Sequence, residues 1–293
     1  MFFIAGVTGH TGRVAAETLL AQGEKVRVLV REAGKGEPWK RLGAEIVVGQ
    51  LGDAPVMTRA LSGTAGAYLL LPPRFDVDDM LAANRPLTVT LADAVHKSGV
   101  KHVVFLSSLG AEHSEGTGPI RSLHDAEAKL RPAVKHFTAL RAGYFFENFA
   151  AVLPATQGGV LPTFLVPDKR IPMIASADIG RAAAELLLEA ADGARIVELT
   201  AIRDWSPNDV AGELTRILGR NVAAQYAPLD AVVPAFTGMG MPRGLAELYR
   251  EMIQGLNEGR IHREQAANVV RRFGMLGAGD VLKGLLEGAT AKA

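Results

Sequence analysis

Three glycines near the N-terminus have the spacing of a phosphate-binding turn. A short apolar run that starts at Phe2 leads into Gly6, Gly9 and Gly12, and a helix-like segment follows. In this context the first glycine permits a sharp turn, the second lets the backbone approach a pyrophosphate, and the third lets the helix pack close to the strand. The amide groups at the start of that helix would point at the phosphates. The sequence therefore predicts a dinucleotide site, with an ordinary strand–helix turn as the alternative.

Two cations follow the second predicted strand, where the ribose of such a cofactor would lie. A site for NAD usually has Asp or Glu about twenty residues after the glycines, to accept hydrogen bonds from the ribose 2′-hydroxyl. Arg31 occupies that place, and Lys35 lies nearby. A guanidinium accepts no hydrogen bond but pairs well with a phosphate. The pattern favours NADP(H) over NAD(H), with a solvated arginine at a strand end as the alternative.

Two hydroxyl groups, those of Ser107 and Ser108, follow the fifth predicted strand. Ligands bind at the carboxyl ends of the strands in an open α/β sheet, so these side chains are expected near the site. Capping of the following turn explains them equally well.

No residue pattern predicts a metal centre. The chain has no cysteine, which excludes disulfides, thiolate ligands and a cysteine nucleophile. Its histidines lack the spacing of a motif such as His-Glu-x-x-His. We therefore expect no bound metal.

Strand-like and helix-like runs alternate along the first half of the chain. The predicted strands are Phe2–Ala5, Lys25–Val30, Glu45–Val48, Ala67–Leu71, His102–Leu106 and Phe137–Leu140, and the predicted helices are Arg13–Gln22, Pro55–Leu61, Asp79–Lys97 and Leu123–Leu130. Several strand runs are nearly continuously apolar, which is typical of strands covered on both faces. The alternation predicts an α/β fold of the Rossmann type, with a doubly wound parallel sheet.

The pattern changes after residue 150. Prolines and glycines interrupt residues 151–175, a helix–strand pair returns at 176–200, and the remainder reads as mainly helical. We predict an NAD(P)-binding domain of residues 1–150, rejoined by 176–200. Residues 151–175 and 201–293 are predicted to form a smaller, mainly helical domain for the substrate or a partner.

Composition excludes several other classes of protein. The chain has 293 residues, of which 48% are hydrophobic, enough for a sizeable core. Lys and Arg (32) nearly balance Asp and Glu (31), so the charge pattern of a nucleic-acid-binding protein is missing. No apolar segment reaches membrane-spanning length, and the first one is too short for a signal peptide. We expect a cytoplasmic protein without membrane contact, as a monomer or a homodimer.

Six segments in the first two thirds of the chain carry a family resemblance. They are Gly6–Gly12, Val28–Arg31, Gly49–Asp53, His102–Ser108, Leu140–Asn148 and Asp178–Gly180. Through them the chain resembles the NmrA-like family of atypical short-chain dehydrogenases/reductases. The resemblance implies a Rossmann domain and an NAD(P) cofactor.

The resemblance also implies contacts for individual residues. The pyrophosphate is expected to contact Gly6, Thr8, Gly9, His10, Thr11 and Gly12, and the 2′-phosphate to contact Arg31 and Lys35. Gln50 and Leu51 are expected beside the adenine, and Leu71 and Pro72 beside the ribose. Ser107 is also expected to lie beside the cofactor. Beside this cofactor site, the aromatic segment with Tyr144, Phe145, Phe146 and Asn148 is predicted to contact the substrate. The family usually has Asp in place of Gln50, but an amide can also bond to the adenine edge.

The proton-donor pair that the resemblance leads one to expect is absent. Standard members of the superfamily use Tyr-x-x-x-Lys, but the residues four places after Tyr68, Tyr144, Tyr226 and Tyr249 are Pro72, Asn148, Asp230 and Ile253. Alignment by length puts Leu123 and Glu127 at the two positions. His124 is next to them and could act as an acid at neutral pH, with a histidine on the helix surface as the alternative. We expect Glu127 and Lys129 on the solvated face of the same helix.

Three functions agree with these residues. The first is an NADPH-dependent oxidoreductase that acts on a quinone or another readily reduced carbonyl compound, with Ser108 or His124 polarising the acceptor. The second is a redox sensor that binds NAD(P) without chemistry and reports its state to a regulatory protein partner. The third is a tailoring enzyme whose small-molecule substrate is an aromatic biosynthetic intermediate.

Overall fold

The structure is a computed structural model that describes residues 1–189, 192–266 and 268–290. Its central feature is a sheet of eight strands: β1 (Phe2–Ile4), β2 (Val26–Val30), β3 (Glu45–Val48), β4 (Gly66–Leu69), β5 (His102–Ser108), β6 (His136–Ala142), β10 (Ala194–Thr200) and β12 (Val269–Phe273). They lie in the order β12-β10-β6-β5-β4-β1-β2-β3, and every neighbouring pair is parallel. The chain winds outward in both directions from β1 and β4, which confirms the predicted doubly wound sheet.

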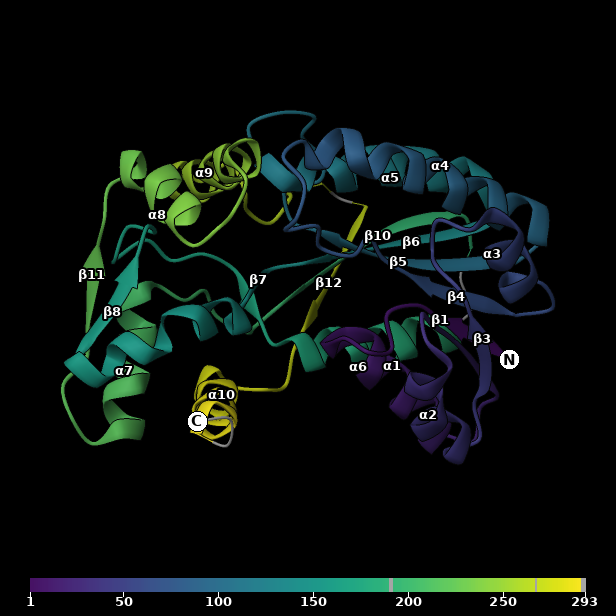
Figure 1. Cartoon of the computed structure of the whole chain (residues 1–293), viewed down its shortest axis with the longest axis horizontal. Helices are drawn as coiled ribbons and strands as arrows, with labels where there is room; N and C mark the ends of the chain where they lie inside the picture. The colour runs from purple at the N-terminus through teal and green to yellow at the C-terminus, as the bar shows by residue number, and fades with distance from the viewer. Residues whose placement is uncertain (190–191, 267, 291–293) are drawn as a thin grey trace.

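Helices cover both faces of this sheet (Figure 1). They are α1 (His10–Ala21), α2 (Glu37–Arg41), α3 (Ala54–Leu61), α4 (Met80–Ser98), α5 (Arg121–Leu130) and α6 (Ser176–Leu188), with the 3₁₀ turns η1 (Ala33–Gly36), η2 (Gly118–Ile120) and η3 (Arg131–Ala133). Phe3 belongs to the core beneath α3, α4 and α5, whereas its neighbour Ile4 belongs to the core beneath α1 and α6. Because both faces are buried, the strands need apolar residues at successive positions rather than at alternate ones.

A second group of elements packs around its own hydrophobic core beside the sheet (Figure 1). It consists of β7 (Tyr144–Phe145), the 3₁₀ segment η4 (Phe146–Gly158), β8 (Val160–Thr163), β9 (Met173–Ile174), α7 (Pro207–Leu218), β11 (Ala223–Tyr226), η5 (Leu229–Ala231), α8 (Val232–Gly238), α9 (Arg243–Glu258) and α10 (Ala278–Thr290). None of the helices in the described ranges combines the length and the apolar character needed to span a bilayer.

The sheet takes one more strand than the sequence predicted. β10 lies in it, and so does β12, which falls within the range 201–293 that we expected in the smaller domain. Residues 267 and 291–293 of that range lie outside the described residues. The sequence of β12, Val-Val-Arg-Arg-Phe, contains two charged residues, because an edge strand has one side open to water. The division into two domains stays a prediction.

The helix that follows the glycine turn packs very closely against α6. A Cβ atom added to Gly180 would lie 2.5 Å from the carbonyl oxygen of Thr11 and 3.0 Å from the amide nitrogen of Ala15. The two helix backbones can approach this closely only because residue 180 has no side chain. This contact fixes α1 against the sheet at the level of the glycine turn.

The substitution Gly180→Ala is expected to lower the free energy of unfolding by about 1–3 kcal/mol, because the added methyl group overlaps the backbone of α1. The matched control is Gly212→Ala within α7, where an added Cβ meets nothing within 4 Å. There the better helix propensity of alanine should raise the free energy of unfolding by up to about 1 kcal/mol. Urea unfolding measures both changes, and equal effects in the two variants would contradict the close contact.

Candidate dinucleotide and substrate site

The glycine turn between β1 and α1 has the geometry of a phosphate cradle. Gly6 has a φ of +69°, in the left-handed region, and its carbonyl oxygen accepts a hydrogen bond of 2.9 Å from the amide of Gly9. A Cβ added to Gly12 would lie only 2.4 Å from the carbonyl oxygen of Ala5 and 2.5 Å from that of Gly6. Glycine is therefore required at position 12 for the close approach of helix and strand.

The start of α1 leaves its amide groups without a capping side chain. Gly9 is the N-cap, no side chain bonds to the first turn, and that turn has no acidic residue. Thr8, Gly9 and His10 are exposed to solvent. Uncapped amides and the positive end of the helix dipole form a site that favours an anion.

The side chain of Thr11 has a structural role. Its hydroxyl oxygen accepts a hydrogen bond of 2.9 Å from the Tyr68 hydroxyl group, and both side chains are buried. Burial raises the pKa of Tyr68, and the bond to Thr11 offsets only part of that rise. Thr11 therefore links α1 to β4, and a contact with a phosphate is left to its backbone amide.

Arg31 and Lys35 lie next to the carboxyl end of β2, with Lys35 in η1. Both side chains are exposed, and neither forms an ion pair or a side-chain hydrogen bond with any residue that the structure describes. Two uncompensated positive charges beside the second strand are available for an anionic group.

The other expected cofactor residues lie at the ends of β3 and β4. Gln50 is exposed and Leu51 is half-buried after β3, while Leu71 and Pro72 are half-buried after β4. The carboxyl ends of parallel strands meet at one edge, so these residues share that edge with the glycine turn. Their roles in binding stay predictions.

Ser107 and Glu127 belong to a buried ion cluster centred on Arg141. The Ser107 hydroxyl donates to Glu127 Oε1 over 2.6 Å, and Arg141 donates to the same carboxylate from Nε (3.0 Å) and Nη2 (2.9 Å). The exposed fractions of Ser107, Glu127 and Arg141 are 3%, 5% and 4%. The expectation that Glu127 lies on a solvated face is therefore wrong. The Ser107 hydroxyl donates its hydrogen bond to Glu127, and its place beside the cofactor stays a prediction.

The second side of the Arg141 guanidinium binds two more carboxylates. Its Nη1 atom lies 3.0 Å from Glu112 Oε2 and 2.9 Å from Glu264 Oε2. Burial alone would lower the pKa of Arg141, but the hydrogen bond and the charge of Glu127, with the charges of Glu112 and Glu264, raise it. Arg141 thus stays charged inside the protein because all its partners are acidic.

The two predicted polarising groups, Ser108 and His124, also have defined partners. Ser108 Oγ donates to the Leu109 carbonyl oxygen over 2.9 Å. His124 Nδ1 lies 2.8 Å from the carbonyl oxygen of Ala111. Because a carbonyl can only accept, the proton sits on Nδ1, and Nε2 of the neutral ring is an acceptor. His124 can therefore donate from Nε2 only as an imidazolium.

An aromatic cluster extends from the carboxyl end of β6 to α9. The Tyr144 ring meets Phe149 edge-on at 6.1 Å, while Tyr249 stacks on Phe75 at 6.4 Å and meets Phe236 edge-on at 5.8 Å. Burial raises the pKa of Tyr144 to about 12, the charge of Tyr249 contributes to this rise, and burial also raises the pKa of Tyr249. Both phenols therefore stay protonated near neutral pH and can donate hydrogen bonds. Sequence analysis missed Tyr249, because no local motif connects α9 with β6.

The remaining expected substrate residues differ in their exposure. Asn148 is exposed in η4. Phe145 is partly buried against the core of the sheet. Phe146 is fully buried and meets the Trp205 ring edge-on at 5.6 Å, so it acts as a core residue here. Tyr144 and Asn148 are thus the better placed of the four for contact with a ligand.

Removal of the Glu127 carboxylate is expected to be strongly destabilising. The substitution Glu127→Ala should lower the free energy of unfolding by about 3–5 kcal/mol, because it leaves a buried charge without its bidentate partner. Lys129→Ala, an exposed position on the same helix, is the control and should change it by less than about 0.5 kcal/mol. Urea unfolding measures both changes. A small effect of Glu127→Ala would show that the Glu127–Arg141 ion pair does not stabilise the fold.

Known proteins resemble this chain across nearly its whole length. A model of the NmrA-like family matches residues 2–270. Quinone oxidoreductase 2 of Escherichia coli (strain K12) is 27% identical over 261 residues, 88% of this chain and 89% of that protein. The NAD(P)H azoreductase of Xenophilus azovorans is 26% identical, with 84% and 85% covered. A solved NADPH-dependent quinone oxidoreductase from Escherichia coli, complexed with NADPH, superposes with a TM-score of 0.82 at 23% identity, over 98% of this chain and 100% of that one. The chain belongs to the NmrA-like family.

Proposed function

We propose that this protein is an NADPH-dependent oxidoreductase that reduces a quinone or another readily reduced carbonyl compound. The observation that carries the proposal is the pairing of a complete phosphate cradle with the uncompensated charge of Arg31, at an edge without a Tyr-x-x-x-Lys pair. The names of the two curated relatives, a quinone oxidoreductase and an NAD(P)H azoreductase, support it.

The residues of the carboxyl edge fit the parts of NADPH. The glycine turn and the α1 amides suit the pyrophosphate, because a Cβ at Gly12 would fill the space that the backbone needs. Arg31 and Lys35 suit the 2′-phosphate, Gln50 and Leu51 the adenine, and Leu71 and Pro72 the ribose. When bound, the reduced nicotinamide supplies a hydride.

The side chains that remain suit an acceptor that needs little acid catalysis. Alignment by length puts Glu127 at the position of the usual lysine, and its carboxylate accepts hydrogen bonds from Ser107 and Arg141. Reduced quinones are stabilised by conjugation, and positioning and exclusion of water then provide most of the rate. We assign Tyr144, Tyr249 and Asn148 to the acceptor, with Ser108 and His124 as polarising groups. Tyr249 belongs to the predicted smaller domain, which would therefore form one side of the acceptor site.

Purified protein is expected to oxidise NADPH with benzoquinone and naphthoquinone, and far more slowly with an unactivated aldehyde. Tyr249→Phe should lower kcat/KM for the quinone about tenfold, the loss expected for one hydrogen bond. The matched control is Tyr226→Phe, at an exposed tyrosine of β11, which should retain the parent rate. Tight NADPH binding without turnover of any acceptor would overturn the proposal and favour a redox sensor.

Cofactor choice is expected to depend on Arg31. Arg31→Ala should raise the KM for NADPH about 10- to 100-fold, because a charged hydrogen bond contributes about 1.5–3 kcal/mol. The KM for NADH, which has no 2′-phosphate, should change little. Arg59→Ala is the control, since Arg59 of α3 is also exposed and has no partner among the described residues. Equal losses with both cofactors would contradict the assignment.

A further inference from the structure

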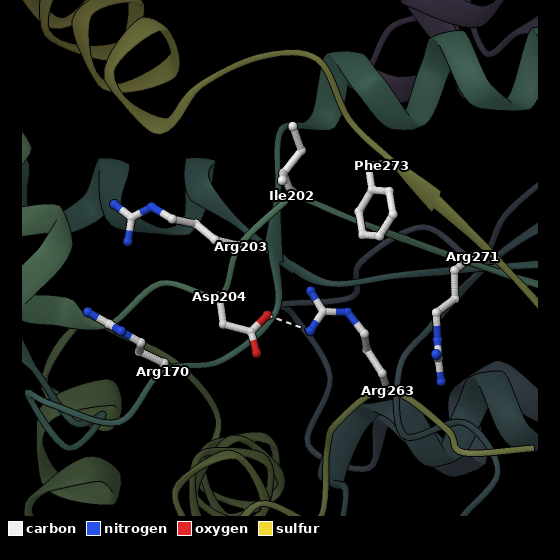
Figure 2. A pocket seen from close by; sticks show the side chains of 7 residues that line it. All are labelled: Arg170, Ile202, Arg203, Asp204, Arg263, Arg271 and Phe273. Carbon is white, nitrogen blue, oxygen red and sulfur yellow. Dashed lines mark ion pairs between the residues drawn. The ribbon is translucent and has the colours of Figure 1, made fainter.

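A pocket of about 470 Å³ lies far along the sheet from the glycine turn. Its lining comes from the residues that follow β10, from the end of β12 and from two loops (Figure 2). β10 is separated from β1 by β6, β5 and β4. At the usual spacing of strands this is roughly 20 Å. The pocket therefore lies apart from the glycine turn, although β10 and β12 end at the same edge of the sheet.

The lining is rich in arginine. Arg170, Arg203, Arg263 and Arg271 all contribute to it, and Asp204 is the one acidic residue among the seven that line it. Three separate loops and one strand place these four side chains around the pocket (Figure 2). The cost of collecting like charges must be offset by acidic neighbours or by a bound anion.

Arg170 and Arg203 share the carboxylate of Asp209, which also belongs to the capping box of α7. Asp209 lies 3.2 Å from Arg170 and 3.5 Å from Arg203. The same carboxylate accepts bonds from the Ser206 amide (3.0 Å) and hydroxyl (3.1 Å). The amide bond, with the bond from the Asp209 amide to Ser206 Oγ (3.1 Å), forms the capping box of α7. Burial alone would raise the pKa of Asp209, but the bonds from Ser206 and Arg170 lower it. One negative charge thus serves two guanidinium groups and a helix cap.

The other two arginines have partners outside Asp209. Nε and Nη2 of Arg263 donate to Thr200 Oγ1 over 3.2 and 2.9 Å, and Nη2 of Arg271 donates to the Glu264 carbonyl oxygen over 2.9 Å. Arg263 lies 2.6 Å from Asp204. Arg271 lies 3.7 Å from Glu198 Oε2, too far for a direct hydrogen bond. Four guanidinium groups therefore face three carboxylates, those of Asp204, Asp209 and Glu198. The nearby Glu112, Glu127 and Glu264 are held by Arg141.

Apolar side chains form the remaining border of the pocket. Ile202 is 80% exposed and Phe273 is 52% exposed, although both are large and apolar. Figure 2 shows them at the same border, with the arginines around the rest. An inorganic ion would leave this apolar surface in water, whereas an organic anion would cover it.

We propose that this pocket binds an organic anion, a carboxylate or phosphate group attached to an apolar or aromatic body. The anionic group binds among the guanidinium groups that line the pocket, and the apolar body covers Ile202 and Phe273. Guanidinium groups match both anions, because each offers two oxygens to a planar fork of donors.

Trp205 provides a direct reporter of binding. The guanidinium carbon of Arg203 lies 3.6 Å from the centroid of the Trp205 ring. The only other tryptophan is Trp39, so Trp39→Phe leaves Trp205 as the single tryptophan, which can be excited selectively at wavelengths that tyrosine does not absorb. An anion that draws Arg203 toward itself changes the environment of this ring and therefore its emission.

The test titrates the Trp39→Phe protein with phenyl phosphate, with phenylacetate and with neutral phenylacetamide, and repeats the titrations by calorimetry. We expect a saturable change in Trp205 emission with at least one anion and none with the amide. The phenyl phosphate and phenylacetate arms show which anionic group is preferred. Arg271→Gln, which leaves the Arg203–Trp205 contact in place, should raise the Kd at least tenfold, and Arg203→Gln should do so by calorimetry.

Two controls separate this pocket from the dinucleotide site. Arg216→Gln changes an exposed, carboxylate-paired arginine of α7 outside the pocket and should leave the Kd unchanged. Saturating NADPH should also leave it unchanged in calorimetry. Absence of saturable binding, equal binding by all arginine variants that melt like the parent, or displacement by NADPH would each overturn the proposal.

Discussion

The buried guanidinium of Arg141 is the interaction on which the surrounding structure depends. It lies on β6 and binds Glu127 on α5, Glu112 in the loop after β5 and Glu264 in the segment before β12. A charge this deeply buried is tolerated only when its donors are all satisfied, so the positions of these segments are coupled. The ion pairs of Arg141 thus hold α5, β6 and the segment before β12 against one another.

The fold and the family could be predicted from sequence because their signals are local. The glycine spacing and the apolar strand runs each need only a few consecutive residues, and the parallel sheet and the NmrA-like family are confirmed. Glu127 was misread because a helix pattern does not say which strand faces it, and its partner Arg141 is fourteen residues away on β6. Tyr249 and β12 were missed for the same reason, since their neighbours are distant in sequence.

The proposed cofactor contacts and the proposed acceptor contacts have different physical requirements. Those to the dinucleotide depend on the absence of side chains and on uncapped amides, as at Gly12 and Gly9. Those proposed for the acceptor depend instead on aromatic rings and on phenol hydroxyls, such as that of Tyr144, whose pKa burial raises. Glycine patterns are visible in a sequence, whereas an aromatic cluster assembled from distant elements is not. This is why the sequence predicted the cofactor directly, whereas the acceptor stays a proposal.

The close contact between α1 and Gly180 has a consequence for how the protein folds during its synthesis on the ribosome. The glycine turn belongs to the first residues to be synthesised, yet α6, which packs closely against the helix behind it, comes more than 150 residues later. Synthesis proceeds at about 5–20 residues per second, so the side of α1 that faces Gly180 waits many seconds for its partner. The part of the chain that appears first is thus among the last to reach its final packing.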